Sequence, residues 1–439
     1  MEQTITYSYW KNAWKQFKFN KPAIVSIYII GAFLFVGFLS PIIANEKPLY
    51  VRYQQQNFFP AFSFSKYYEL KNANGLTEKI QLDLIEWKQI KATSIIWPLV
   101  PYSPFASDLL NSNFKSPTDE QFIKNEEGII SKLPFRFRHW LGTGSRGEDV
   151  LSGLIHGARI SMTIGFLSMA IASLIGLFLG SMAGFFGDNN LTITKGKFWW
   201  LIIGIALAWN YAFTVRTFAL ESAISTSGFS LLFQLLISIA IFSCIIFIFS
   251  KTGNFFSKIP VLKNKMFVPV DFLISRCIEI LHSLPIFILV ITVATVAKPS
   301  FINLMIIIGL TSWTGIARLT RSEFLRIRQM EYIQASKALG FSQWRIIFKH
   351  ALPNALAPAL VSIAFGVASA ILTESSLSFL GVGVPVDVQT WGKMLSTGKS
   401  DFNAWWLVIF PGLMIFVSVV CYNLIGEGLR EALDPKQKK

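Results

Sequence analysis

The chain has 439 residues, of which 52% are hydrophobic and only 15% are charged, and its mean hydropathy is +0.49. This composition excludes an ordinary soluble domain and indicates a membrane protein. The formal net charge of +15 does not indicate nucleic-acid binding, because the basic residues flank apolar runs, as they do in the cytoplasmic loops of membrane proteins.

The N-terminal segment, residues 1–22, mixes aromatic residues with lysines. Such a mixture suits a helix that lies at the membrane surface, and a frayed basic tail is the alternative. The apolar run 23–44 that follows is long enough to cross a bilayer and lacks a small-residue cleavage site. We therefore expect a cytoplasmic interfacial elbow followed by a retained first transmembrane span.

Seven further apolar stretches are long enough to cross a bilayer. In chain order they are 161–186, 198–213, 229–250, 279–297, 301–317, 358–383 and 404–425. Gly176, Gly180 and Gly184 recur at a spacing that lets helices approach each other closely in lipid. The sequence thus predicts eight spans that pack as a bundle.

The short loops decide the expected orientation. Loops 251–276 and 318–349 are rich in Lys and Arg, whereas the short loops of the opposite side carry few, so the basic loops are expected in the cytoplasm. An even number of spans then places both chain ends in the cytoplasm and residues 45–159 outside. Alternation over residues 79–90 predicts a strand in this external segment.

Residues 331–354 form the most informative loop. Tyr332, Ser336 and Leu339 share one face at helical spacing. Gly340 suits a left-handed C-terminal cap, and Ser342 can cap a second helix. The sequence predicts a helix, a stop and another helix, and this hairpin is interpreted either as a docking surface for another protein or as an interfacial helix that only anchors the loop.

The same loop resembles the coupling loop of ABC-importer permeases, in which Glu-Ala-Ala precedes a Gly and, further on, a Leu-Pro pair. Here Gln334-Ala335-Ser336, Gly340 and Leu352-Pro353 have the matching spacing, with His350 at a position that is hydrophobic in the general pattern. With His at this position, the loop resembles those of the dipeptide, oligopeptide and nickel permease branch. The resemblance implies an ATPase-docking surface made of Gln334, Ala335, Ser336, Leu339, Gly340, Trp344, Leu352 and Pro353.

Three further stretches, 139–161, 374–381 and 428–435, are similar to the same branch. The first departs from the family pattern at Gly144 and Glu148, where the family has Asp and Arg, so the roles of these two positions are open. The resemblance leaves two regions uncovered, which are the long external segment and a basic-flanked pair of spans at 189–265.

The resemblance implies an all-α polytopic membrane protein in the bacterial inner membrane. Its six-helix type I permease core, residues 160–435, would contain the inserted two-helix hairpin 189–265 and the coupling loop 318–357, with the external subdomain 45–159 between the first two spans. The implied partners are a homologous permease subunit, two cytoplasmic ABC ATPases, an external substrate-binding protein and the lipid bilayer. Peptides are the expected substrates, with dipeptides, oligopeptides and nickel chelates left open.

No catalytic residue, metal site or cofactor is expected, since ATP would be bound by the partner ATPases. The sequence Gly398-Lys399-Ser400 imitates the end of a phosphate-binding loop, but Lys393 stands where its first glycine belongs. The three cysteines are far apart in the sequence and lack ligand-like spacing.

Two groups of charged residues in or beside the predicted spans each have two possible roles. Glu374 lies within a span, where a charge costs about 2.5–3.5 kcal/mol unless it faces protein or water, so it should line the pathway or bond across the permease interface. Arg276, Glu279 and His282 form either a proton relay or a satisfied cluster at the membrane edge. A proton-coupled secondary transporter and a non-transporting membrane scaffold therefore remain alternative functions.

Overall fold

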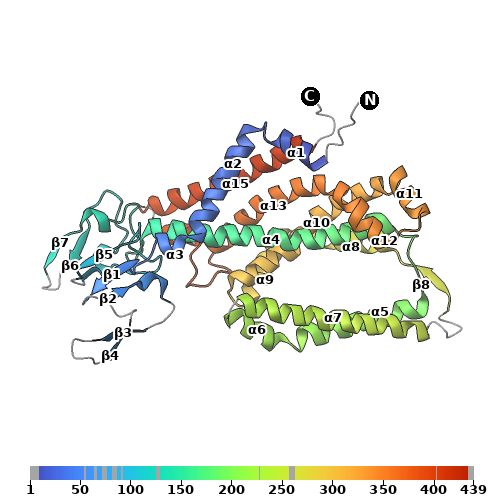
Figure 1. Ribbon diagram of the computed structural model, residues 1–439, viewed down its shortest axis with the longest axis horizontal. Coiled ribbons are helices and arrows are strands. Elements are labelled where there is room, and N and C mark those ends of the chain that lie inside the picture. Colours follow the sequence, from blue (N-terminus) through green and yellow to red (C-terminus); the bar gives the residue numbers. More distant parts are fainter. Residues whose placement is uncertain are drawn as a thin grey trace. The chain divides into compact units, whose positions relative to one another are not determined.

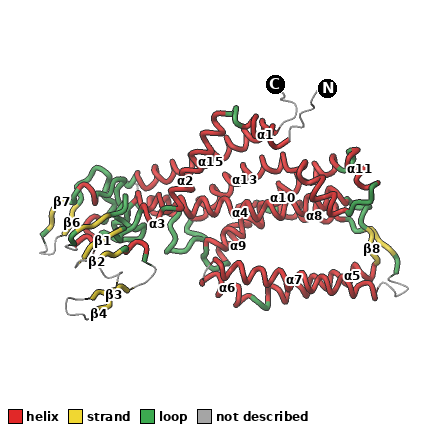
Figure 2. Tube along the Cα trace, viewed as in Figure 1, coloured by secondary structure: helices red, strands yellow, loops and turns green. Residues whose placement is uncertain are grey.

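A computed structural model of the chain describes residues 9–53, 56–63, 67–71, 77–81, 87–89, 92–124, 129–226, 228–256, 263–401 and 403–433. The described chain is mostly helical, and most of its strands lie between helices α3 and α4 (Figure 1, Figure 2). It divides into a first unit, residues 1–175, 284–316 and 356–439, and a second unit, residues 176–283 and 317–355.

In the first unit, the N-terminal helices α1 and α2 lie beside the C-terminal helix α15 (Figure 1). The helices concerned are α1 Tyr9–Phe17, α2 Lys21–Phe38, α3 Ser40–Ile43 and α15 Trp406–Leu433. Phe17 and Ala23 are buried against Ala432 of α15. Asn20 caps α2 by accepting from the Ala23 amide at 3.0 Å and also donates to the Glu431 carboxylate at 2.8 Å. A surface helix thus forms within the predicted segment 1–22.

The strands described within residues 45–159, the predicted external segment, are all short. These are β1 Tyr50–Tyr53, β2 Gln56–Phe58, β3 Tyr67–Lys71, β4 Thr77–Gln81, β5 Ser94–Ile96, β6 Phe122–Lys124 and β7 Ile130–Lys132. An antiparallel sheet has the order β2-β1-β5, and β3-β4 and β6-β7 are separate antiparallel hairpins. Strand β4 covers the beginning of the predicted strand 79–90, a 3₁₀ turn covers 87–89, and residues 82–86 and 90 lie outside the described residues.

Helix α4, Val150–Phe186, begins at residue 150, so its first turns lie within the predicted external segment 45–159. Its 37 residues correspond to about 55 Å at 1.5 Å per residue, well above the roughly 30 Å of a bilayer's hydrocarbon core. Helix α4 therefore extends beyond the membrane.

The other helices of the first unit include α9 Ile286–Val296 and α14 Trp391–Gly398, and α10 Phe301–Ile327 and α13 Leu352–Phe379 each contribute one part. The Trp391 side chain at the start of α14 is fully buried, and its Nε1 donates to the Leu154 carbonyl of α4 at 3.0 Å. Gly157 allows this contact, since a Cβ there would lie 2.7 Å from the Trp391 ring.

The second unit contains the rest of α4, α10 and α13 together with α8 Val270–Ser283, α11 Glu331–Ala338 and α12 Gln343–Arg345. Its packing confirms the predicted close approach at two of the glycines. A Cβ on Gly180 would lie 2.5 Å from the Ala317 carbonyl oxygen, and one on Gly184 would lie 2.5 Å from the Phe324 Cβ. Only glycine lets α4 and α10 come this close.

The inserted hairpin also belongs to the second unit. Its elements are β8 Thr192–Thr194, α5 Lys195–Trp209, α6 Thr217–Thr226, α7 Gly228–Phe256 and β9 Lys265–Phe267. Strands β8 and β9 pair antiparallel, so the hairpin begins and ends at the same place (Figure 1). Trp200 of α5 stacks on Phe249 of α7, with 5.0 Å between ring centroids, and donates to Thr252 at 2.8 Å. The helices of the hairpin are thus held to each other.

Six described helices are long and apolar enough to cross a membrane, or up to eight if each of two bent helix pairs counts as one span. All eight predicted spans coincide with helices, but the predicted span 279–297 is not continuous. Helix α8 ends at Ser283 and α9 begins at Ile286. Pro285 explains the break, because its ring restricts the preceding residue and it lacks the amide hydrogen that a helix requires.

Candidate functional site

The loop between α10 and α13 forms the predicted helix, stop and second helix. Gly340 ends α11 with φ of +75°, and the Phe341 amide donates back to the Ser336 carbonyl at 3.2 Å, as in a Schellman cap. Ser342 caps α12 by accepting from the Arg345 amide. A π-helical turn, Ile346–Ala351, then leads into α13.

Buried apolar side chains fix this loop to the ends of the long helices. Ile333 of α11 and Ile347 of the π-helical turn are fully buried, in one cluster with Phe324 of α10 and Phe185 and Phe186 of α4. Lys337 adds a cation–π contact 5.4 Å from the Phe185 ring centroid. Sequence reasoning missed these anchors, although isoleucines in a loop rich in basic residues are a signal that could have found them.

The opposite face of the loop is exposed and carries large apolar groups. The Leu339 side chain is 73% exposed and Trp344 is 53% exposed, and Trp344 stacks on Phe348 with 5.8 Å between ring centroids. Gln334 and Ala335 are exposed on α11, and nothing lies within 4 Å of the position of a Gly340 Cβ. Exposed apolar groups gathered on a polar loop are typical of a protein-binding surface.

Three of the predicted docking residues lie elsewhere. Ser336 is buried, and its Oγ donates to the Tyr332 carbonyl at 2.7 Å, so its side chain is not part of the exposed face. Leu352 packs on the buried cluster, and Pro353 lies in the first turn of α13. Ser336 and Leu352 support the loop from within, and His350 does so too, with its ring stacked on Phe341.

Glu374 lies in the interior of its own chain and is 0% exposed. The Ser378 Oγ donates to one carboxylate oxygen at 2.7 Å and the Ser375 Oγ to the other at 3.4 Å. Ser161 of α4 and Thr390 before α14 also bond to it. In this structure Glu374 therefore neither lines an open pathway nor faces a partner, because four hydroxyls of the same chain satisfy it.

We expect Glu374→Gln to fold like the wild type, since an amide keeps the volume and can still accept from Ser378. Glu374→Leu should lower the free energy of unfolding by about 1–3 kcal/mol, because it leaves the buried hydroxyls without their acceptor. Thermal unfolding of the two purified variants and of the wild type measures these stabilities. Equal losses for the two variants would contradict this assignment and indicate a role for the negative charge.

The stretch that begins at His139 ties the external segment to α4. The His139 imidazole is buried between the carboxylates of Asp149, at 2.8 Å, and Asp108, at 3.3 Å, and lies against the Tyr102 ring. Gly142 and Gly147 both have positive φ, and a Cβ on Gly147 would lie 2.0 Å from the Asp108 carbonyl oxygen. This stretch is thus a structural joint.

Protonation of His139 should stabilise the joint. Burial lowers the pKa of His139, but the hydrogen bonds to Asp108 and Asp149 outweigh it and raise the pKa above the ordinary 6.5. A folded-state pKa above the unfolded value gives stability that is fully present below pH 6.5 and is lost as the pH rises through the folded-state pKa. The melting temperature of wild type minus that of His139→Gln should therefore shrink with rising pH, and a pH-independent difference would contradict the prediction.

Arg276 and Glu279 pair with each other at 2.5 Å on α8, and both side chains are more than half exposed. His282 is also exposed on this helix. An exposed pair that is satisfied within one helical turn corresponds to the predicted surface cluster. It does not form a buried chain of groups such as a proton relay requires.

Comparison with known proteins places the loop and its supporting helices in a family. Residues 261–439 match the binding-protein-dependent transport system inner membrane component, and residues 8–62 match the N-terminal transmembrane domain of oligopeptide transport permease C. The di/tripeptide transport system permease protein DppC of Pseudomonas aeruginosa is 30% identical over 302 residues, which are 69% of this chain and 73% of that protein. The chain belongs to the family of binding-protein-dependent transport system inner membrane components.

Longer alignments include the regions that the motifs left uncovered. The dipeptide transport system permease protein DppC of Alkalihalophilus pseudofirmus is 26% identical over 438 residues, covering 100% of this chain and 93% of that protein. The inner membrane ABC transporter permease protein YejE of Escherichia coli is 27% identical over 425 residues, which cover 97% of this chain and 96% of that protein. The external segment and the hairpin thus fall within the aligned length.

As a member of this family, the protein is a multi-pass inner membrane permease of an ABC importer, with the predicted all-α type I core. Membership favours an ABC permease over a proton-coupled transporter or a scaffold. It also implies a partner ATPase and a substrate-binding protein.

Proposed function

We propose that this permease imports peptides through a pathway formed with a second, homologous permease, and that two cytoplasmic ATPases dock on the paired coupling loops, of which the α11–α12 loop is the one on this chain. The observation that carries the proposal is the division of this loop into an exposed apolar face, with Leu339 and Trp344, and an anchored face, with Ile333 and Ile347. Peptides are proposed because the printed names of the relatives include dipeptide and di/tripeptide permeases.

The anchored face gives the loop a mechanical role. Because protein interiors are closely packed and transmit strain, a displacement of α11 must move the side chains of Phe185 and Phe324 on α4 and α10. Movement of the docked ATPases during ATP hydrolysis would in this way reach the spans. Exposed Gln334, Ala335 and Gly340 leave room for a partner's surface to approach the backbone of α11.

ATP itself would be bound by the partners. The lookalike Gly398-Lys399-Ser400 begins at the last residue of helix α14, whereas a phosphate-binding loop connects a strand to the N-terminus of a helix. We also propose that both chain ends lie in the cytoplasm, since α1 packs beside the C-terminal end of α15 and the basic loops 251–276 and 318–349 favour that side.

The test is reconstitution of the permease with its neighbouring permease, ATPases and binding protein in liposomes, followed by uptake of radiolabelled trialanine. We expect uptake that requires ATP and is unaffected by a protonophore. Uptake without ATP that a protonophore abolishes would instead establish a proton-coupled transporter. Absence of flux in an assembled complex with active ATPases would contradict a peptide substrate.

A further inference from the structure

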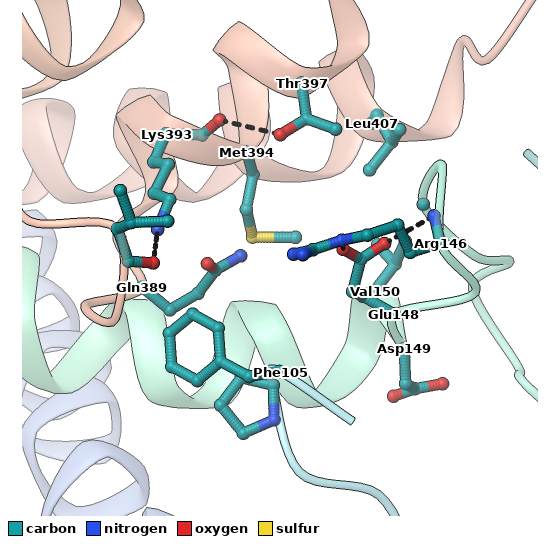
Figure 3. A pocket seen from close by; sticks show the side chains of 13 residues that line it. Phe105, Arg146, Glu148, Asp149, Val150, Gln389, Lys393, Met394, Thr397 and Leu407 are labelled. Carbon is teal, nitrogen blue, oxygen red and sulfur yellow. Dashed lines mark hydrogen bonds and ion pairs between the residues drawn. The ribbon is translucent and has the colours of Figure 1, made fainter. Parts of the chain in front are cut away.

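A small open pocket of about 80 Å³ lies within the first unit, between the turn before α4 and helix α14 (Figure 3). Phe105 and Met394 supply apolar walls, and Arg146, Glu148 and Gln389 supply polar ones. A pocket of this size holds one end of a ligand and not a whole drug-sized molecule, for which several hundred Å³ are usual.

Two charged residues of the pocket are already committed to the fold. The Lys393 ammonium donates to the carbonyls of Val388 at 3.0 Å, Pro385 at 3.5 Å and Val386. Asp149 accepts from the Ser152 amide at 2.7 Å and bonds His139. The charged groups of Lys393 and Asp149 therefore already have hydrogen-bond partners within the protein.

Arg146 differs, because only part of its guanidinium is occupied. Its Nε donates to one Glu148 oxygen at 2.7 Å, and its backbone amide donates to the other at 2.9 Å. The Arg146 side chain is 64% exposed, whereas that of Glu148 is 19% exposed. Figure 3 shows the end of the guanidinium pointing into the pocket, toward the Gln389 carboxamide.

Gly144 makes this arrangement possible. A Cβ at this position would lie 2.7 Å from the Glu148 carboxylate oxygen, so a larger residue would displace that carboxylate. Gly144 and Glu148 are the two positions at which the chain departs from the family's Asp and Arg. The two positions depend on each other, because Gly144 leaves space for the Glu148 carboxylate and Glu148 orients the Arg146 guanidinium.

We propose that Arg146 and Gln389 bind the C-terminal carboxylate of the transported peptide. A guanidinium held through Nε keeps its terminal N–H groups for a carboxylate, and the planar fork matches the two carboxylate oxygens. Phe105 and Met394 would contact the last side chain of the peptide. This inference rests on the peptide substrate of the proposed function and assigns to it a specific contact.

The test uses the purified full-length permease in lipid nanodiscs, without ATPases, and the probes trialanine and trialanine amide. Saturation-transfer NMR titrations give the affinity of each. We expect wild type to prefer the free acid, and Arg146→Gln to weaken trialanine binding about tenfold, the lower range for a hydrogen bond to a charged group. The affinity for trialanine amide should not change.

Arg136→Gln is the matched control, since Arg136 is an exposed arginine of the external segment that donates to the Trp97 carbonyl. It should leave both affinities unchanged, and equal melting temperatures of all three proteins exclude misfolding. Equal weakening for acid and amide, no effect of Arg146→Gln, or no preference for the acid in wild type would each overturn the proposal.

The ATPase-dependent uptake assay is independent of this titration, so failure of the carboxylate contact is distinguishable from failure of the proposed function. The outcome in which Arg146→Gln affects neither titration can also assign the pocket another function. If Arg146→Gln changes neither titration but lowers the affinity of the external binding protein, the pocket is a docking surface for that protein.

Discussion

Leu339→Asp is expected to release the ATPases from the permease while leaving the permease folded. The Leu339 side chain is 73% exposed at the end of α11, so its loss should change the free energy of unfolding by no more than about 0.5 kcal/mol. In the proposed complex it is an apolar anchor, and burying a carboxylate in its place is unfavourable. Loss of a central anchor of this kind costs about 2 kcal/mol or more, which is roughly a 30-fold weaker complex.

Retention of the ATPase on affinity-purified permease, followed by titration in nanodiscs, measures this effect. Leu99→Asp is the matched control, because Leu99 is 81% exposed in the external segment and should not affect ATPase binding. If the Leu339→Asp permease retains the ATPase at wild-type affinity, α11 is not part of the docking surface. The loop would then be the interfacial anchor that was the alternative interpretation.

Gly184→Leu is expected to prevent stable folding of the second unit. A Cβ on Gly184 would lie 2.5 Å from the Phe324 Cβ and 2.6 Å from the Arg321 carbonyl oxygen, and neither atom can move without shifting α10. Overpacking of this kind costs about 3 kcal/mol or more. The cluster that anchors the α11–α12 loop contains Phe185 and Phe324, so the same change should also disturb the loop.

Gly315→Leu on α10 provides the comparison, since nothing lies within 4 Å of the position of its Cβ. Size-exclusion chromatography after heating should show aggregation of Gly184→Leu at a temperature at which wild type and Gly315→Leu remain monodisperse. Similar melting behaviour of the two leucine variants would mean that α4 and α10 are not in close contact in the membrane.

Regular, local signals were sufficient to predict much of this architecture. Spans were found by the length of their apolar runs, and the cap at Gly340 by its need for positive φ. The break before Pro285 was missed, although proline stops helices, because the hydropathy on both sides is continuous. Span detection by hydropathy averages over a window and cannot show where a helix is interrupted.

The site was harder to predict where a side chain's role depends on distant partners. Periodicity placed Ser336 on the same face as Leu339, but their exposures differ because Ile333 turns α11 onto α4 and α10. Glu374 was expected to seek water or a partner subunit, yet Ser161 and Thr390, remote in the sequence, supply its hydrogen bonds. Such satisfaction depends on tertiary structure, which spacing along the chain does not reveal.

Strands β8 and β9 show how the fold accommodates the hairpin between them. Because Thr192–Thr194 and Lys265–Phe267 pair directly, the length of everything between them does not alter the distance that the remaining chain must bridge. A change in the length of a segment attached in this way leaves the positions of its two ends unchanged. The two short strands therefore hold the ends of the hairpin together, and the rest of the second unit is independent of the hairpin's length.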